Sequence, residues 1–142
     1  MKPQDVPPGP LLVDTDVFSW IAFQRGRHQE FGQLVQGHIL TVSFSTAGEL
    51  WAGAERANWG EARRRTLEDI LRRYVVLPAT DAVVRQWGRL HAQFKDQLGA
   101  NDMWTAACAL AQNDPLPIVT GNLKHFRPIS AAFPITLIHP DL

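Results

Sequence analysis

The sequence predicts an α/β fold of three layers, with a central, mainly parallel sheet of about five strands covered by helices on both faces. Short apolar runs without polar alternation recur along the chain, and such runs are typical of strands buried on both faces. Amphipathic helical patterns separate these runs. Because right-handed crossovers place the connecting helices on the two faces of a parallel sheet, this alternation favours the three-layer arrangement.

The first strand is the clearest element. Leu11, Leu12 and Val13 form an apolar run that leads directly into Asp14 and a helical pattern. Further strands are expected at residues 39–44, 75–77, 118–120 and 135–138. From apolar side chains spaced by three and four, helices are expected around residues 17–22, 31–35, 46–57, 61–74, 80–98 and 101–110. Residues 121–134 are expected to be a loop between the last two strands.

Length and composition are those of one domain. A chain of 142 residues buries roughly two thirds of its unfolded surface, and we expect a single domain over residues 11–142. Residues 1–10 contain four prolines and no periodicity, which predicts a poorly ordered leader. The single cysteine, Cys108, excludes a disulfide framework and favours a reducing, cytoplasmic compartment. No apolar run is long enough for a signal peptide or a membrane span.

Four acids stand at junctions between predicted elements: Asp14, Asp16, Glu49 and Asp102. Each has a structural interpretation. Asp14 or Asp16 can cap the following helix, Thr46 and Glu49 match a capping box, and Asp102 suits a first helical turn. Taken together they favour a site, because strand ends and helix starts at one edge of a parallel sheet can converge.

Converging carboxylates repel, and a hard divalent cation with oxygen ligands, Mg²⁺ or Mn²⁺, resolves that repulsion. Such an ion can activate water and stabilise the charge that develops on a phosphoryl group, so phosphodiester hydrolysis is the favoured chemistry. The net charge is zero, with fourteen Lys plus Arg against fourteen Asp plus Glu. A nucleic-acid substrate must therefore be held by a local patch rather than by a global field.

Four motifs then carry a family resemblance. They are Leu12-Val13-Asp14-Thr15-Asp16-Val17, Ser43-Phe44-Ser45-Thr46-Ala47-Gly48-Glu49-Leu50, Asn101-Asp102-Met103-Trp104-Thr105-Ala106-Ala107 and Val119-Thr120-Gly121-Asn122-Leu123-Lys124-His125-Phe126. Their order and spacing resemble PIN-domain ribonucleases, and more closely the VapC-type toxins of bacterial toxin–antitoxin modules. The resemblance implies a compact PIN-like fold, magnesium-dependent endonucleolytic cleavage of RNA and inhibition by a cognate antitoxin.

The resemblance also implies roles for individual residues. Asp14 and Asp102 match the metal-binding aspartates, and Glu49 matches the acid that helps to hold metal or to position water. Two positions depart from the family pattern. Asp16 stands where Asn is usual, and Asn122 stands where the family has a fourth acid. Asn122 brings an oxygen but no charge, which leaves a second metal ion open, and Asp16 restores that charge if it points into the site.

Other candidates have two interpretations each. Thr46 and Thr120 either orient the acids or a phosphate, or act as local caps. The helix over residues 61–74 is rich in arginine, and its cations either contact the RNA backbone or form a solvated face paired with neighbouring acids. These candidates for RNA binding are Arg63, Arg64, Arg65, Arg72 and Arg73. His125 is expected to pack or to contact RNA rather than to act as a general acid.

We also expect partners. A homodimer and a small antitoxin are predicted, with aromatic side chains of the first two helices receiving an apolar segment of the antitoxin: Phe18, Trp20, Phe23 and Phe31. Trp51 and Trp59 either extend that groove or line the homodimer contact.

Two alternatives to the nuclease stay open. One is a catalytically silent PIN-fold module that binds RNA or protein. The other is a haloacid-dehalogenase-like phosphatase, which requires a lysine and an acidic pair downstream of its threonine motif. After Thr120 the chain has Asp141 as its only acid, which disfavours the phosphatase.

Overall fold

The computed structural model describes all residues, 1–142. Its five strands form one sheet in which every neighbouring pair is parallel. The strands are β1 (Leu11–Val13), β2 (Leu40–Ser43), β3 (Val75–Leu77), β4 (Ile118–Val119) and β5 (Leu137–Ile138). Their order across the sheet is β3-β2-β1-β4-β5, so β1 lies at the centre and the chain order reverses beside it. The predicted parallel α/β sheet is confirmed.

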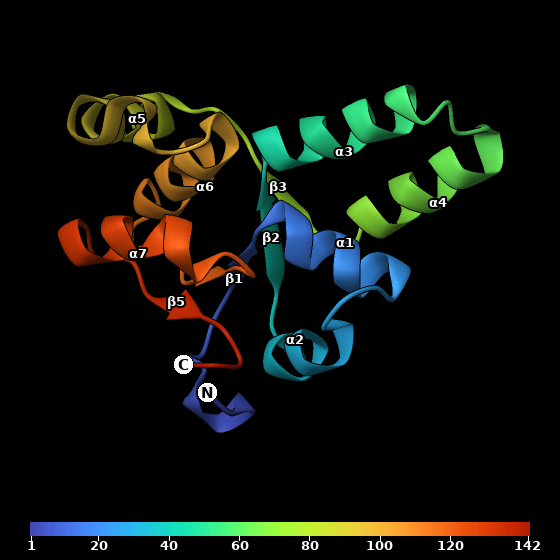
Figure 1. The fold of residues 1–142 in the computed structure, drawn as a ribbon, viewed down its shortest axis with the longest axis horizontal. Helices are drawn as coiled ribbons and strands as arrows, with labels where there is room; N and C mark the ends of the chain where they lie inside the picture. Colours follow the sequence, from blue (N-terminus) through green and yellow to red (C-terminus); the bar gives the residue numbers. More distant parts are fainter.

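Helices connect all the strands. The first three crossovers use pairs of helices: α1 (Thr15–Phe23) with α2 (His28–Val35), α3 (Phe44–Arg56) with α4 (Glu61–Leu71), and α5 (Asp81–Phe94) with α6 (Ala100–Leu110). A single helix, α7 (Leu123–Ala132), joins β4 to β5. Helices α5, α6 and α7 lie on one side of the molecule and α1 to α4 on the other (Figure 1). None of the helices combines the length and the apolar character needed to cross a membrane.

The alternation of side chains along the strands divides the apolar residues into two cores. Leu12 belongs to a cluster of 17 buried residues that also contains residues of α5, α6 and α7. Leu11 and Val13, on either side of it, belong to a second cluster of 15 buried residues with α1, α2 and α4. β1 therefore fixes both helical layers, and its carboxyl end lies between them.

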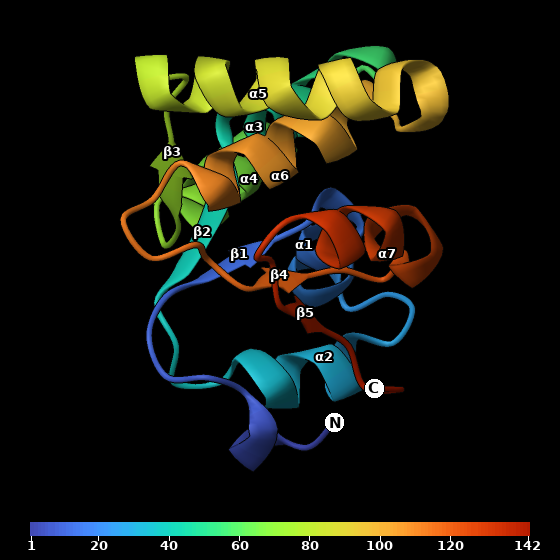
Figure 2. The same cartoon turned by 90° about the vertical axis from the view of Figure 1, so that its left-hand side faces the viewer.

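Helix α7 differs from the loop expected at residues 121–134. Pro128 lies inside this helix, where it cannot donate a backbone hydrogen bond, so the local sequence has the pattern of a helix breaker. Burial of Phe126 and Ile129 in the first core stabilises the helix nonetheless. Figure 2 shows α7 beside α6, with β4 and β5 below it.

Residues 1–10 also differ from the expected unpacked leader. They contain a short 3₁₀ helix, η1 (Pro3–Asp5), and Val6 is only 8% exposed within the second core. The Met1 ammonium donates to the carbonyl oxygen of Pro140 at 3.1 Å. One well-placed apolar side chain and contacts with the carboxyl-terminal segment therefore order a stretch that has no internal periodicity.

Candidate active site

The four junction acids line one cavity. Asp14, Asp16, Glu49 and Asp102 surround a space of about 330 Å³ together with Asn122, His125 and the segment Gly99–Asn101. They come from three separate segments: the end of β1, helix α3 and the start of α6. The cavity lies beyond the carboxyl ends of the central strands, where β1 and β4 diverge into helices on opposite faces. Ligands of open α/β sheets bind at such a position.

Asp14 is the buried acid of the site, with 4% of its surface exposed. One carboxylate oxygen accepts the backbone N–H of Thr15 at 2.8 Å, so Asp14 does cap α1. Its other oxygen accepts the hydroxyl of Thr120 at 3.0 Å. Burial, followed by repulsion from Asp102, raises the pKa of Asp14 to about 7. Capping and a site role are therefore compatible, because the two oxygens have different partners.

Asp102 lies in the first turn of α6 and is half-buried. Burial raises the pKa of its carboxyl, while the hydrogen bond with His125 opposes that rise. Nδ1 of His125 lies 3.1 Å from Oδ2 of Asp102 and 2.8 Å from the side-chain amide of Asn122. The tautomer of His125 decides which contact forms a hydrogen bond: Nδ1 donates to Asp102 when it carries a proton and accepts from the Asn122 amide when it does not. His125, which was not expected beside the acids, is thus in direct contact with one of them.

Glu49 and Asp16 are exposed and lack the hydrogen bonds that hold the carboxylates of Asp14 and Asp102. Helix α3 begins at Phe44 rather than at Thr46, because Ser43 accepts the backbone N–H of Thr46 at 3.0 Å as the cap. The capping box expected between Thr46 and Glu49 therefore does not form. Glu49 lies beyond the first turn of α3, with its carboxylate at the border of the cavity.

A polar network beneath the acids links three helices. The side-chain amide of Asn101 donates to the Thr15 hydroxyl at 2.9 Å, and its oxygen accepts the Ser45 hydroxyl at 2.5 Å. The hydroxyls of Thr15 and Thr46 lie 3.0 Å apart. Thr46 thus supports α1 and α6 rather than contacting an acid, whereas Thr120 contacts Asp14 directly. Sequence reasoning missed Asn101, although it directly precedes Asp102 at a helix start.

The donors of the cavity fit a hard divalent cation. No group of three or more His, Cys, Asp and Glu side chains has a metal-binding arrangement in the structure. The chemistry of the lining nevertheless suits such an ion, because carboxylate and amide oxygens predominate and no Lys or Arg lines the cavity. A bound cation would offset the repulsion that helps to raise the pKa of Asp14. Asp14 and Asp102 are close enough for the charge of Asp102 to raise the pKa of Asp14.

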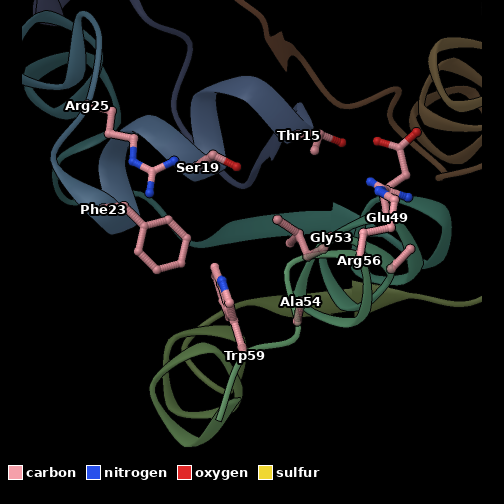
Figure 3. Close-up of a pocket in the computed structure, with 11 residues that line it drawn as sticks. Thr15, Ser19, Phe23, Arg25, Glu49, Gly53, Ala54, Arg56 and Trp59 are labelled. Atoms are coloured by element: carbon pink, nitrogen blue, oxygen red, sulfur yellow. The ribbon is translucent and has the colours of Figure 1, made fainter. Parts of the chain in front are cut away.

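A second groove, of about 430 Å³, lies between α1 and α3 and shares Thr15 and Glu49 with the acidic cavity. Figure 3 shows Glu49 at one end and the rings of Phe23 and Trp59 at the other. These rings meet edge to face, with centroids 5.7 Å apart. Arg25 and Arg56 also line the groove. It is therefore apolar and basic where the neighbouring cavity is acidic.

Of the aromatic residues expected to receive a partner, Phe18 and Phe31 are fully buried in the second core. Trp20 and Phe23 keep partial exposure. Helix α1 turns Phe18 toward the sheet, and α2 covers the second core with Phe31. The exposed aromatic surface is therefore smaller than the composition of these helices suggests.

The arginine-rich helix α4 lies apart from the acidic cavity, on the far side of α1 and α3 from α6 and α7 (Figure 1). None of its residues lines that cavity. Arg64 pairs with Glu55 at 2.6 Å, Arg72 with Glu68 at 2.8 Å and Arg65 with Glu61 at 3.9 Å. Arg63 lies over the ring of Trp59, 5.5 Å from its centroid. Arg73 borders a different, apolar pocket beside Tyr74.

Comparisons with known proteins agree with this geometry. The family model "PIN domain" matches residues 11–127. "Ribonuclease VapC2" of Haemophilus influenzae is 30% identical over 125 residues, which cover 84% of this chain and 92% of that protein. Among solved structures, VapBC-1 from nontypeable Haemophilus influenzae has a TM-score of 0.74 at 25% identity and covers 94% of this chain and 99% of its own.

A further structure, VapBC2 from Rickettsia felis bound to a DNA fragment from the promoter, has a TM-score of 0.74 at 19% identity. It covers 91% of this chain and 97% of its own. At that identity the likeness concerns the fold alone. Nucleases of the VapC type depend on a metal ion in general, which agrees with the donor set of the cavity. The phosphatase alternative falls away, since the chain belongs to the PIN-domain family and, within it, to the VapC ribonucleases.

Proposed function

We propose that this protein is a magnesium-dependent endoribonuclease that acts in the cytoplasm as the toxin of a toxin–antitoxin module. One observation carries the proposal: four carboxylates from three separate segments line a single cavity that no Lys or Arg enters. Such an arrangement is unfavourable for folding alone, because like charges repel and burial disfavours the ionised form. A bound cation and a phosphodiester substrate account for the clustering of these carboxylates.

In this proposal Asp14 and Asp102 hold Mg²⁺, and Mn²⁺ is a substitute. When bound, the ion polarises a phosphoryl oxygen and lowers the pKa of a coordinated water. Thr120 and the Thr15 backbone fix the Asp14 carboxylate, and His125 fixes that of Asp102. These contacts orient the carboxylates before the ion arrives.

Glu49 positions the attacking water, because its exposed carboxylate borders the cavity and caps no helix. Asp16 adds charge at the exposed side of the cavity, while Asn122 contributes an uncharged oxygen. Because Asn122 brings no charge and Asp16 lies at the exposed side, the cavity favours one tightly held ion over two.

The antitoxin is proposed to occupy the groove between α1 and α3. Solved relatives are described as VapBC complexes of toxin–antitoxin systems, so an antitoxin is the partner to expect here. Phe23 and Trp59 offer an apolar anchor, and Arg25 and Arg56 favour acidic residues of the partner. Since the groove shares Glu49 with the acidic cavity, a basic residue of the same segment would reach the acids and compete with metal. A homodimer of this chain completes the proposed assembly.

The decisive experiment is cleavage of single-stranded RNA by the purified protein with magnesium, with manganese and with a chelator, followed by end mapping. We expect discrete cuts with either ion and none with the chelator. Binding of RNA without any cut under all three conditions would instead favour the catalytically silent module.

For the antitoxin, co-expression with the partner encoded beside this gene should yield an inactive complex. Phe23→Asp should weaken that complex while leaving RNA cleavage intact, because Phe23 lines the groove but not the acidic cavity. An undiminished complex with Phe23→Asp would place the antitoxin elsewhere.

A further inference from the structure

Three aromatic rings form a stack on the surface where α5 meets α6. The rings of Trp87 and His91 have centroids 4.7 Å apart and an interplanar angle of 19°. Trp87 and Trp104 are 5.2 Å apart at 21°. Trp104 also meets Phe44 edge to face, at 5.2 Å. Trp87 and Trp104 pack against the first core and stay partly exposed, while His91 is exposed, so one end of the stack faces solvent.

The stack borders a pocket of about 280 Å³ that adjoins the acidic cavity. Ala100 lines both spaces, whereas Asp102 and Trp104, two residues apart on α6, lie on different faces of that helix and line one space each. Ligand sites for drug-sized molecules occupy about 300–1,000 Å³, so this pocket is of a size for one planar ring system. Figure 2 shows α5 lying along α6.

Lys95 supplies a positive charge at the same pocket. It forms no salt bridge, unlike Arg64, Arg72 and Arg85, which pair with acids. Its backbone has φ +49° and ψ −120°, a conformation that glycine adopts readily and that side chains with a Cβ disfavour.

We propose that this pocket binds a nucleobase of single-stranded RNA next to the cleaved phosphodiester, with the base stacked on the exposed His91 end of the stack that His91, Trp87 and Trp104 form. Lys95 neutralises the adjoining phosphate. The inference rests on the proposed ribonuclease function and adds to it a subsite for the substrate. Aromatic faces bind single-stranded nucleic acid by stacking, and a nearby cation follows the backbone. A protein surface is the competing occupant, but continuity with the acidic cavity and the unpaired lysine favour RNA.

Asp96 lies in the same pocket and gives the base a hydrogen-bond acceptor. A carboxylate accepts from an exocyclic amino group such as N4 of cytosine.

The test compares His91→Ala and Lys95→Gly with the wild type on a short single-stranded RNA that carries the mapped cleavage site. Both residues are exposed, and glycine relieves the backbone conformation at position 95, so both variants should fold. Each is expected to raise KM about tenfold, as loss of one stacked or neutralised nucleotide does, with kcat within about twofold. Arg85→Gln removes a cation from the same helix away from the pocket and should leave KM unchanged.

Binding is measured in parallel with 2-aminopurine placed beside the scissile phosphate, in a chelator that prevents cleavage. Stacking should quench its fluorescence in the wild type, and Trp87→Leu should reduce the quenching. Normal KM and quenching in the variants, with an active wild type, would overturn the subsite alone. Variants that keep a normal KM but turn a dimer into monomers in light scattering would also overturn the subsite, because the rings would then bind a protein surface. A wild type that neither cleaves nor binds RNA would overturn the proposed function itself.

Discussion

The acidic cavity and helix α4 arrange their charges in opposite ways. In the cavity, Asp14 is buried, its pKa is raised to about 7, and no Lys or Arg is part of the lining. Along α4 the charges are exposed and alternate, and Arg65 and Arg72 each pair with a glutamate one turn earlier. Pairs of this kind contribute only a few tenths of a kcal/mol and neutralise each other locally.

This difference shows where the chain carries electrostatic energy that its own folding does not relieve. On α4, Arg64 and Arg65 pair with glutamates and Arg63 lies over the Trp59 ring, so most of the positive charge of this helix has a partner within the protein. The cavity is not, because desolvation and repulsion both act on its carboxylates. A ligand of positive charge is what the cavity lacks, so substitutions there should affect activity far more than substitutions on α4.

The largest effect is expected from Asp14→Asn and Asp102→Asn. Each variant removes a proposed ligand while keeping the size of the side chain, and asparagine still caps α1 at position 14. RNA cleavage in magnesium should fall by about a hundredfold or more, since loss of an outer partner alone typically costs about 10–100-fold. Glu61→Gln, on α4, is the matched control. Wild-type rates in either aspartate variant would refute the site.

The second expectation concerns pH and stability of the metal-free protein. The folded pKa of Asp14, about 7, lies above its ordinary value of 3.8, so the folded state holds a proton that the unfolded state releases. Stability should therefore fall as pH rises from about 4 to about 7, by at most ~4 kcal/mol from this group. Thermal unfolding of the wild type and of Asp14→Asn between about pH 4 and about pH 7 measures this loss of stability.

Asp14→Asn should remove most of that fall and should be the more stable protein at pH 7 without metal. Magnesium should restore the wild type, because an ion that binds only the folded state stabilises it by mass action. If the stability of the two proteins depends on pH in the same way, the pKa of Asp14 is not raised in the folded state.

Glu49→Gln is expected to separate activity from stability. Glu49 is exposed and caps no helix, so its loss should change the free energy of unfolding by less than about 0.5 kcal/mol. Cleavage should nevertheless slow by about tenfold to a hundredfold if the carboxylate positions water. Chemical denaturation and single-turnover cleavage on the same preparation give both numbers. A stability loss of the size of a helix cap, with normal turnover, would assign Glu49 to α3 instead.

Local pattern was sufficient to predict the strands and the position of the junction acids. Asp14 directly follows an apolar run, and the carboxyl ends of parallel strands share one edge, so its convergence with Asp102 follows from the fold class. Helix α7 was not predictable in this way, because Pro128 has the local pattern of a breaker and only the burial of Phe126 and Ile129 overrides it.

The contact between His125 and Asp102 depended on that missed helix. His125 lies on α7 and Asp102 on α6, so the contact exists only through the packing of the two helices. The same holds for Asn101, whose partners Thr15 and Ser45 lie on α1 and α3. The inward direction of Phe18 and Phe31 was equally a matter of how the helices sit on the sheet. Spacing along the chain identifies candidates, whereas their partners are set by tertiary packing.

The smallest effect is expected on α4. Arg64 is a poor choice for the test, because its guanidinium donates to the Trp59 carbonyl at 2.8 Å and pairs with Glu55, so its removal disturbs the turn between α3 and α4. Arg65 on α4 and Arg73, two residues after the end of α4, are both exposed. Arg65 lies 3.9 Å from Glu61, and Arg73 forms no salt bridge. Arg65→Gln with Arg73→Gln should leave both folding and kcat unchanged.

If α4 binds the RNA backbone, this double variant should lower affinity equally for all sequences. It should also flatten the slope of log K against log salt by about one for each phosphate that the variant no longer neutralises, and so by about two at most. If the arginines only neutralise their own helix, the slope stays as in the wild type. We expect a change of less than about one, because α4 lies across α1 and α3 from the acidic cavity and its other cations are already paired. Binding isotherms at several salt concentrations decide between them, and a slope change of about two would extend the RNA path from the cavity onto α4.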